Sequence, residues 1–297
     1  MKKGLILGLA VMMLTGYTTL SYGAFKDSGW GTRPAGMGGA FVAIADDANS
    51  PMWNPAGISQ IDWHEGSFMY AKLYTGLDNV DMGLNYLSYA QPVSNIGHFG
   101  INWANFTTAS LYKEDTIAIT YARKISDIVA AGINIKYLSN QYTLDSYAKD
   151  DPVFSDAKGK SVVTVDLGVL VKATKKLNAG LSIKNLTQPD IGLKSKDVVP
   201  METKAGVSYK VNDKVLTALD VTSRDDDFNV HIGGESWFAD DVIGIRAGGN
   251  MKELSFGFSV MPKLVDTADF QIDYSLIWPL TIEETSGTHR VSFTTMF

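Results

Sequence analysis

The sequence IVAAGINIKY, residues 128–137, places an apolar side chain at almost every second position. The sequence VTVDLGVLV, residues 163–171, does the same. Between the apolar positions lie Asn134, Lys136 and Asp166. Because successive side chains of a strand point to opposite sides of a sheet, both stretches are predicted to be strands with one apolar face and one polar face.

This alternation recurs about fourteen times between residue 61 and residue 297. A charge facing lipid near the middle of a bilayer costs about 2–4 kcal/mol for Lys or Arg, so the polar faces are expected to line a lumen. The residues predicted to face it are Asn134, Lys136, Asp166, Lys184, Asp220, His231, Glu235, Arg246 and Asp273. The sequence therefore predicts an all-β fold, a transmembrane antiparallel β-barrel of about 14 strands over residues 61–297. An exported soluble β-sandwich with one wet face is the alternative.

The links between the strands are expected to alternate in length, as they do in outer-membrane barrels. Short turns are predicted at 124–127, 174–176, 211–214 and 238–241, and longer links at 107–114, 141–160, 187–200 and 279–288. The acidic run 225–227 is expected at the tip of an outer loop. The last strand ends on Phe297, which resembles the C-terminal signal read by the outer-membrane assembly machinery. An even number of strands predicts both chain ends on the periplasmic side.

Residues 1–23 read as an export signal, with Lys2 and Lys3 before an apolar run. A membrane-anchoring helix is the alternative, although the run is shorter than the roughly 20 residues that a spanning helix needs. The whole chain has a formal net charge of −6 and no cysteine. This balance disfavours a nucleic-acid partner, and the lack of cysteine excludes a disulfide framework and thiolate metal sites. The sequence therefore predicts a protein of the bacterial outer membrane, surrounded by its lipids.

Residues 24–60 differ in character from the rest of the chain. The stretch GWGTRPAGMGGAFVAIADDANSPMWNPAGIS, residues 29–59, is too rich in glycine and proline for a long helix or strand, yet its apolar side chains need burial. We expect it to fill the lumen as a plug. The residues proposed for this plug are Arg33, Gly36, Gly38, Gly39, Phe41, Asp46, Asp47, Trp53, Asn54, Pro55 and Ala56.

The runs RPAGMGGAFVAIADD, residues 33–47, and WNPAG, residues 53–57, resemble the N-terminal signature of the PorV/PorQ group. That group belongs with the FadL-like channels for long-chain fatty acids and other hydrophobic compounds. The resemblance implies a barrel of fourteen strands whose N-terminal segment sits in the lumen as a hatch. It also places Asn54, Pro55 and Ala56 in that hatch.

Other chemistries find little support in the sequence. The glycine run is not followed by GK[ST], and the four histidines lie in separate segments, so neither a phosphate loop nor a histidine metal pair is expected. Asp46, Asp47 and Asn49 are read as calcium ligands, as caps of a turn or as partners of a basic lumen residue. We expect no enzyme activity and no cofactor.

Two functions follow from this reading. The first is passive passage of small hydrophobic solutes through a plugged lumen. The alternative is a PorV-like, non-conducting partner or shuttle of type IX protein secretion that binds exported cargo. The partners expected besides lipid are the barrel assembly machinery, a hydrophobic small molecule and proteins of the secretion system.

Overall fold

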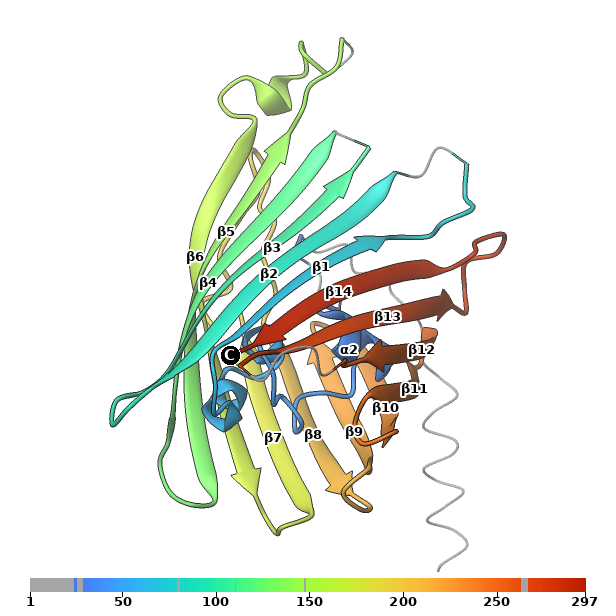
Figure 1. The fold of residues 1–297 in the computed structure, drawn as a ribbon. Helices are drawn as coiled ribbons and strands as arrows, with labels where there is room; N and C mark the ends of the chain where they lie inside the picture. The colour runs from blue at the N-terminus through green and yellow to red at the C-terminus, as the bar shows by residue number, and fades with distance from the viewer. Residues whose placement is uncertain (1–23, 26–28, 79–80, 110, 147, 263–266) are drawn as a thin grey trace, which may run out of the picture.

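The computed structural model describes residues 24–25, 29–78, 81–109, 111–146, 148–262 and 267–297, and the expected signal at 1–23 lies outside them. In this part of the chain fourteen antiparallel strands pair in sequence order, and β1 closes on β14 (Figure 1). The strands are β1 (Glu65–Lys72), β2 (Met82–Val93), β3 (Gly97–Thr108), β4 (Tyr112–Lys124), β5 (Val129–Tyr142), β6 (Gly159–Lys172), β7 (Leu177–Lys184), β8 (Glu202–Lys210), β9 (Val215–Arg224), β10 (Asp227–Phe238), β11 (Ile243–Asn250), β12 (Glu253–Val260), β13 (Asp269–Pro279) and β14 (Thr288–Met296). The predicted all-β barrel and its strand number are confirmed.

The two faces of the strands differ as their alternation predicts. On β5, Ile135 is 56% exposed and Tyr137 is 45% exposed, whereas Asn134 and Lys136 between them are buried. The nine polar residues expected in the lumen are all buried, His231 being the most exposed at 8%. Among the described residues, no helix has the length and apolar character needed to cross a bilayer.

One rim of the barrel carries mostly short turns. Four predicted turns lie there, and the linkers seen are 125–128, 173–176, 211–214 and 239–242. The opposite rim carries the long loops 143–158 and 185–201. Short turns face the periplasm in barrels of this type, so we assign the long-loop rim to the cell exterior.

Two expected outer loops are tight turns. Only residues 109–111 separate β3 from β4, so the long link predicted at 107–114 is wrong. Polar residues there are strand residues opposite one another, as Thr107 is to Lys113 in the β3–β4 register, because strand ends that reach water tolerate them. The acidic run 225–227 likewise forms a two-residue turn, with Asp227 already on β10.

The two ends of the described chain lie on opposite rims. Phe297 and His64 exchange backbone hydrogen bonds of 3.0 Å at the short-turn rim. At the outer rim, Arg224 donates to the carbonyl oxygens of Ala24 and Phe25, at 3.0 and 3.2 Å. The expectation that both ends lie on the periplasmic side is therefore wrong for residues 24–25, because the chain between them and β1 runs back through the barrel.

Residues 29–61, called the inner segment from here on, lie within the ring of strands. They include three short helices, α2 (Thr32–Gly36), η1 (Ser50–Met52) and η2 (Pro55–Gln60). Helix α2 contacts β11 to β14, and η2 contacts β2 to β6, on the other side of the ring. Backbone near Val42 reaches β7 and β9. The inner segment thus contacts the wall almost all the way around.

Candidate functional site

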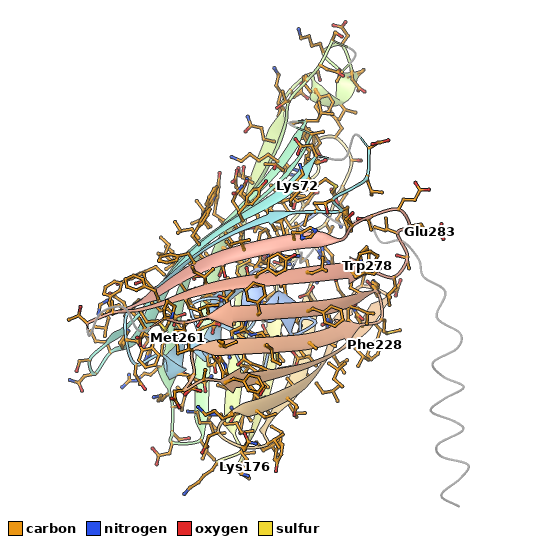
Figure 2. All side chains as sticks on the ribbon, turned by 45° about the vertical axis from the view of Figure 1, so that its right-hand side comes forward. Lys72, Lys176, Phe228, Met261, Trp278 and Glu283 are labelled. Carbon is orange, nitrogen blue, oxygen red and sulfur yellow. The ribbon has the colours of Figure 1, made fainter. Side chains whose placement is uncertain are left out.

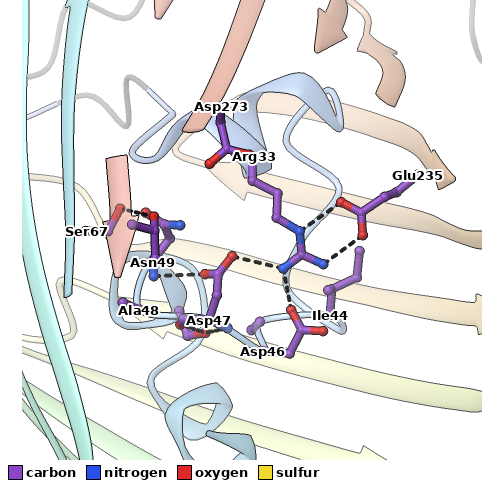
Figure 3. Close-up of polar contacts among 12 residues, drawn as sticks. Arg33, Ile44, Asp46, Asp47, Ala48, Asn49, Ser67, Glu235 and Asp273 are labelled. Carbon is purple, nitrogen blue, oxygen red and sulfur yellow. Dashed lines mark hydrogen bonds and ion pairs between the residues drawn. The ribbon is translucent and has the colours of Figure 1, made fainter. Parts of the chain in front are cut away.

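An ion pair between Arg33 and Glu235 of β10 attaches the inner segment to the wall. Nε and Nη2 of Arg33 donate to the two carboxylate oxygens at 2.8 and 2.9 Å (Figure 3). Arg33 Nη1 donates to Asp46 at 2.6 Å and to Asp47 at 2.9 Å. The acidic pair of the sequence therefore binds a guanidinium from its own segment.

Electrostatics reinforce this arrangement. Burial acts to lower the pKa of Arg33, but the carboxylates of Asp46, Glu235 and Asp47 outweigh it and raise this pKa well above its usual value. Burial raises the pKa of Asp47 above its usual value, and Arg33 partly offsets that rise. On the wall, Arg246 of β11 also binds Glu235 and lies 3.1 Å from Asp273 of β13. The ion pairs thus connect the inner segment to three strands.

Backbone groups of the inner segment are held by side chains of the wall. Asp220 of β9 accepts from the amides of Phe41 and Val42, at 2.7 and 2.8 Å. The Nδ2 atom of Asn134 on β5 donates to the carbonyl of Pro51 at 2.8 Å. Asn54 makes the reverse bond, donating to Val169 of β6 at 3.0 Å. These bonds satisfy backbone groups that burial would otherwise leave unpaired.

Trp53 lies at the centre of an aromatic and cationic cluster. Its ring packs edge-on against Phe41, with the ring centroids 6.0 Å apart. The ammonium of Lys204 lies 4.4 Å from the Trp53 ring centroid and that of Lys184 lies 5.6 Å away. The indole Nε1 donates to the carbonyl of Trp30 at 2.7 Å.

Glycines of the strands let the backbone of the inner segment lie directly against the wall, and these contact points are called glycine seats below. A Cβ on Gly132 would overlap the backbone at Pro55, and one on Gly180 would overlap the carbonyl of Val42. Gly233 and its cross-strand neighbour Gly248 lie against Met37 in the same way. Only glycine lets two backbones approach this closely. Sequence reasoning missed this set, although its signal was available as glycines at inward positions of successive strands.

The remaining predicted plug residues contact the wall in different ways. Gly36 packs against Gly257 of β12, and Gly38, with a φ of +67°, packs against Gly249. Gly39 lies beside His231, whose Nδ1 is 2.8 Å from the carbonyl oxygen of Gly38.

Not every predicted lumen residue reaches the inner segment directly. Lys136 pairs with Asp166 at 2.8 Å and donates to Asn185, so these charges tie β5 to the outer loop that follows β7. Two contacts that the sequence did not suggest are Glu65 accepting from the amide of Ala48 at 3.0 Å and Arg290 donating to the carbonyl of Gly29 at 2.6 Å. Both lie at inward positions of strands, which is the signal that could have found them.

Two cavities lie on the outer side of the inner segment. The larger has a volume of about 220 Å³ and is lined by Trp53, Tyr74, Lys204 and Arg290, among others. The smaller, of about 40 Å³, lies between Phe25 and Trp30. The lumen therefore opens toward the exterior as a small vestibule with an aromatic floor and charged walls.

Comparison with known families decides the wider assignment. Residues 48–281 match the family described as type IX secretion system membrane protein PorP/SprF. The chain belongs to this family. PorP/SprF membership and the barrel together place it in the outer membrane. The PorV/PorQ subgroup expected from the N-terminal motif stays a prediction, because the match concerns PorP/SprF. No curated protein matches the sequence.

Several solved barrels share the fold. The toluene transporter TbuX of Ralstonia pickettii is 12% identical, with 90% of this chain and 98% of that chain covered at a TM-score of 0.63. A FadL homologue of Pseudomonas aeruginosa is 14% identical, with coverage of 91% and 97% at a TM-score of 0.60. The toluene transporter TodX of Pseudomonas putida is 10% identical, with coverage of 89% and 96% at 0.57. At these identities the similarity establishes a FadL-like fold.

Proposed function

We propose that this PorP/SprF barrel is a non-conducting component of type IX secretion that keeps its lumen closed and binds other secretion proteins. In this proposal residues 24–60 are a fixed plug and residues 61–297 are the wall. The observation that carries it is the fixation of the inner segment by the two-bond Arg33–Glu235 ion pair, by backbone bonds to Asp220 and by the glycine seats. Removing one partner from a buried ion pair costs about 3–5 kcal/mol, so large movement of such a plug is unfavourable.

The outer loops are the proposed cargo surface. The loops 143–158 and 185–201 are the longest links described and lie at the outer rim, the second packing Ile191 and Val199 against Leu138. Lys194 pairs with Asp156, which connects the two loops. Asp190 accepts from the amides of Gly192 and Asp197 at 3.0 and 2.9 Å, which fixes the second loop. A preformed surface of this kind binds with a smaller entropic cost than flexible loops do.

The second candidate is passage of small hydrophobic solutes. The vestibule of about 220 Å³ above Trp53 favours it, because an aromatic floor suits an apolar ligand. The solved neighbours described as toluene transporters share this fold. This function requires the inner segment to shift.

A disulfide between the inner segment and the wall separates the two candidates. The natural chain has no cysteine, and a Cβ on Gly36 or on Gly257 lies 3.4 Å from the Cα of the other residue. Because a Cα–Cβ bond is about 1.5 Å long, the two Cβ atoms would be at most about 4.9 Å apart, and a disulfide needs about 3.5–4.5 Å. We expect the oxidised G36C/G257C variant to support cargo secretion as well as the reduced protein does, with each single variant as control.

Two results would count against the non-conducting role. Secretion that stops on oxidation and returns with reductant means that the segment must move. Uptake of an apolar solute by liposomes carrying the reduced variant, blocked by oxidation, supports the second candidate instead. Normal cargo secretion in a strain lacking the gene would contradict the secretion role altogether.

A further inference from the structure

Charged residues are unevenly distributed around the short-turn rim: basic residues gather on one side of it, although the protein as a whole is acidic. Three neighbouring hairpins, which join β4 to β5, β6 to β7 and β8 to β9, carry seven cations and two carboxylates. The cations are Arg123, Lys124, Lys172, Lys175, Lys176, Lys210 and Lys214, and the carboxylates are Asp127 and Asp213. All nine are exposed. Figure 2 shows Lys176 at this rim, well separated from Glu283 on the outer side.

The rest of the same rim has the opposite character. Its described residues include the exposed carboxylates of Asp62, Asp240, Asp241 and Asp269 and no lysine or arginine. Over the residues that the structure describes, the basic sector thus occupies adjacent hairpins on one side of the barrel. For a chain of net charge −6, such local concentration produces a directed field at the periplasmic surface.

Contacts within the molecule account for little of this charge. Lys214 lies 2.7 Å from Asp241, and the ammonium of Lys176 donates to the carbonyl of Val211 at 3.2 Å. Within the described part of the chain, no carboxylate lies within ion-pair distance of Lys124, Lys175 or Lys210. These charges are available to a partner.

Apolar side chains stand among the cations. Ile125 is 66% exposed, Ile128 is 58% exposed and Val211 is 45% exposed, all at or beside the hairpin tips. Protein interfaces combine such apolar anchors with a charged rim that sets orientation and association rate.

We propose that the basic sector, the exposed face of these three hairpins, is the docking site for the acidic surface of a periplasmic protein of the secretion machinery. The proposal rests on the proposed secretion function. Lipid headgroups are the competing source of negative charge, but they surround a barrel on every side. A headgroup-binding rim would therefore carry cations around its whole circumference, whereas the described residues of this rim carry lysine and arginine on one side.

The test is site-specific photo-cross-linking in cells of the producing bacterium, using the full-length protein. A photoreactive amino acid replaces Ile125 or Val211 in the basic sector, or Trp63 on the acidic side as control. We expect both basic-sector probes to cross-link one periplasmic protein, identified by mass spectrometry and acidic on the contacting face, and the Trp63 probe to give much less of that adduct.

Charge reversal then tests the mechanism. In K124E/K175E/K210E, which changes one lysine per hairpin, we expect the adduct to fall at least about tenfold, because like charges across an interface suppress binding. The matched control K149E/K158E/K196E makes the same charge change at exposed positions of the outer loops and should leave the adduct unchanged.

Three results would overturn the docking proposal: adducts with lipid only, no adduct, or a protein adduct that the rim variant leaves unchanged. The heat-shifted band of folded barrel on a gel confirms that the variant is assembled. Cargo secretion in the gene-deletion strain tests the secretion function separately. If deletion stops secretion and the rim variant changes neither adduct nor secretion, only the docking proposal fails.

Discussion

Arg33 and Glu235, which are 202 residues apart in the sequence, form a two-bond ion pair inside the barrel. Their side chains are 13% and 4% exposed, so water solvates neither charge well. Arg246 binds the same Glu235, and Arg33 also binds Asp46 and Asp47. Because each charge has partners on both the inner segment and the wall, this network is where the two parts of the fold depend on each other.

Removing the guanidinium should loosen the inner segment. We expect the Arg33→Met variant to have a free energy of unfolding about 3–5 kcal/mol lower than that of the natural protein, because Glu235 and Asp47 lose a buried counter-charge. The measurement is the temperature at which the folded band converts to the unfolded band on a gel, with protease cleavage within residues 29–61 as a local readout. Lys252→Met is the control, because its pair with Asp227 is 37% exposed on each side and should contribute only about 0–1 kcal/mol. Equal effects of the two variants would contradict the role of Arg33.

The adjacent glycines Gly233 and Gly234 give a matched test of the glycine seat. A Cβ on Gly233 would overlap the carbonyl of Met37, whereas one on Gly234 has only the carbonyl of Leu216 near it, at 3.8 Å. We expect Gly233→Ala to lower the free energy of unfolding by about 1–3 kcal/mol, as overpacking usually does, and to speed hydrogen exchange of the amides around Met37. Gly234→Ala should behave as the natural protein. Similar exchange in both variants would show that the close approach does not hold the segment.

The strands could be predicted from the sequence, but the contacts that their inward side chains make inside the barrel could not. One physical reason explains both. In a membrane strand every second side chain faces lipid and must be apolar. Alternating residues such as Ile133 and Ile135 therefore identify the strand from the sequence alone. The residue types at inward positions follow no such simple rule, because each is matched to its own partner, either in the inner segment or elsewhere on the wall. Asp220 is needed only because the amides of Phe41 and Val42 point at it. Sequence could place Asp220 inward without finding its partner.

The length of the link between β3 and β4 and the position of residues 24–25 at the outer rim could not be predicted from the sequence either. Between the end of β3 and the start of β4, Ala109 has a φ of 48°, in the left-handed region, and an alanine gives no sign in the sequence of adopting it. The reach of Phe25 to the outer rim depends on Glu114 and Arg224, on strands far along the chain. Such long-range contacts leave no local periodicity.

The second outer loop should lose order in acid. The amides of Asp197 and Gly192 donate to the Asp190 carboxylate and hold its pKa below the usual 3.8. A depressed pKa means that this carboxylate stabilises the loop above its usual pKa, and that the contribution is lost as pH falls through the lower folded value. The protection of the amides of residues 189–199, measured as their hydrogen exchange relative to the intrinsic rate at each pH, should fall between pH 6 and pH 2.5. Asp190→Asn should show faster exchange already at pH 6; exchange equal to the natural protein would contradict the prediction.

Residues 24–25 should be reachable from outside the cell. Arg224 donates to the carbonyls of Ala24 and Phe25, and Glu114 accepts from the amide of Phe25 at 3.0 Å. We expect A24C to react with a membrane-impermeant maleimide added to intact cells, and several-fold faster when Arg224 is changed to Ala. The control is W63C, exposed at the short-turn rim, which should react only after the outer membrane is opened. Labelling of W63C but not A24C in intact cells would reverse the assigned orientation.

The C-terminal Phe297 should matter more for assembly than for final stability. Its backbone exchanges two 3.0 Å hydrogen bonds with His64, and its ring stacks on the His64 imidazole with the centroids 5.6 Å apart. The side chain is nevertheless 57% exposed, so Phe297→Ala keeps both backbone bonds and loses only about 0.5–1.5 kcal/mol of ring contact. If the terminal aromatic is the assembly signal, the variant should fold several-fold more slowly in membranes containing the assembly machinery and reach nearly the natural unfolding temperature. Phe293→Ala, an exposed aromatic in the middle of β14, should fold at the natural rate. Equal folding rates for the two variants would show that the machinery does not read the terminal residue.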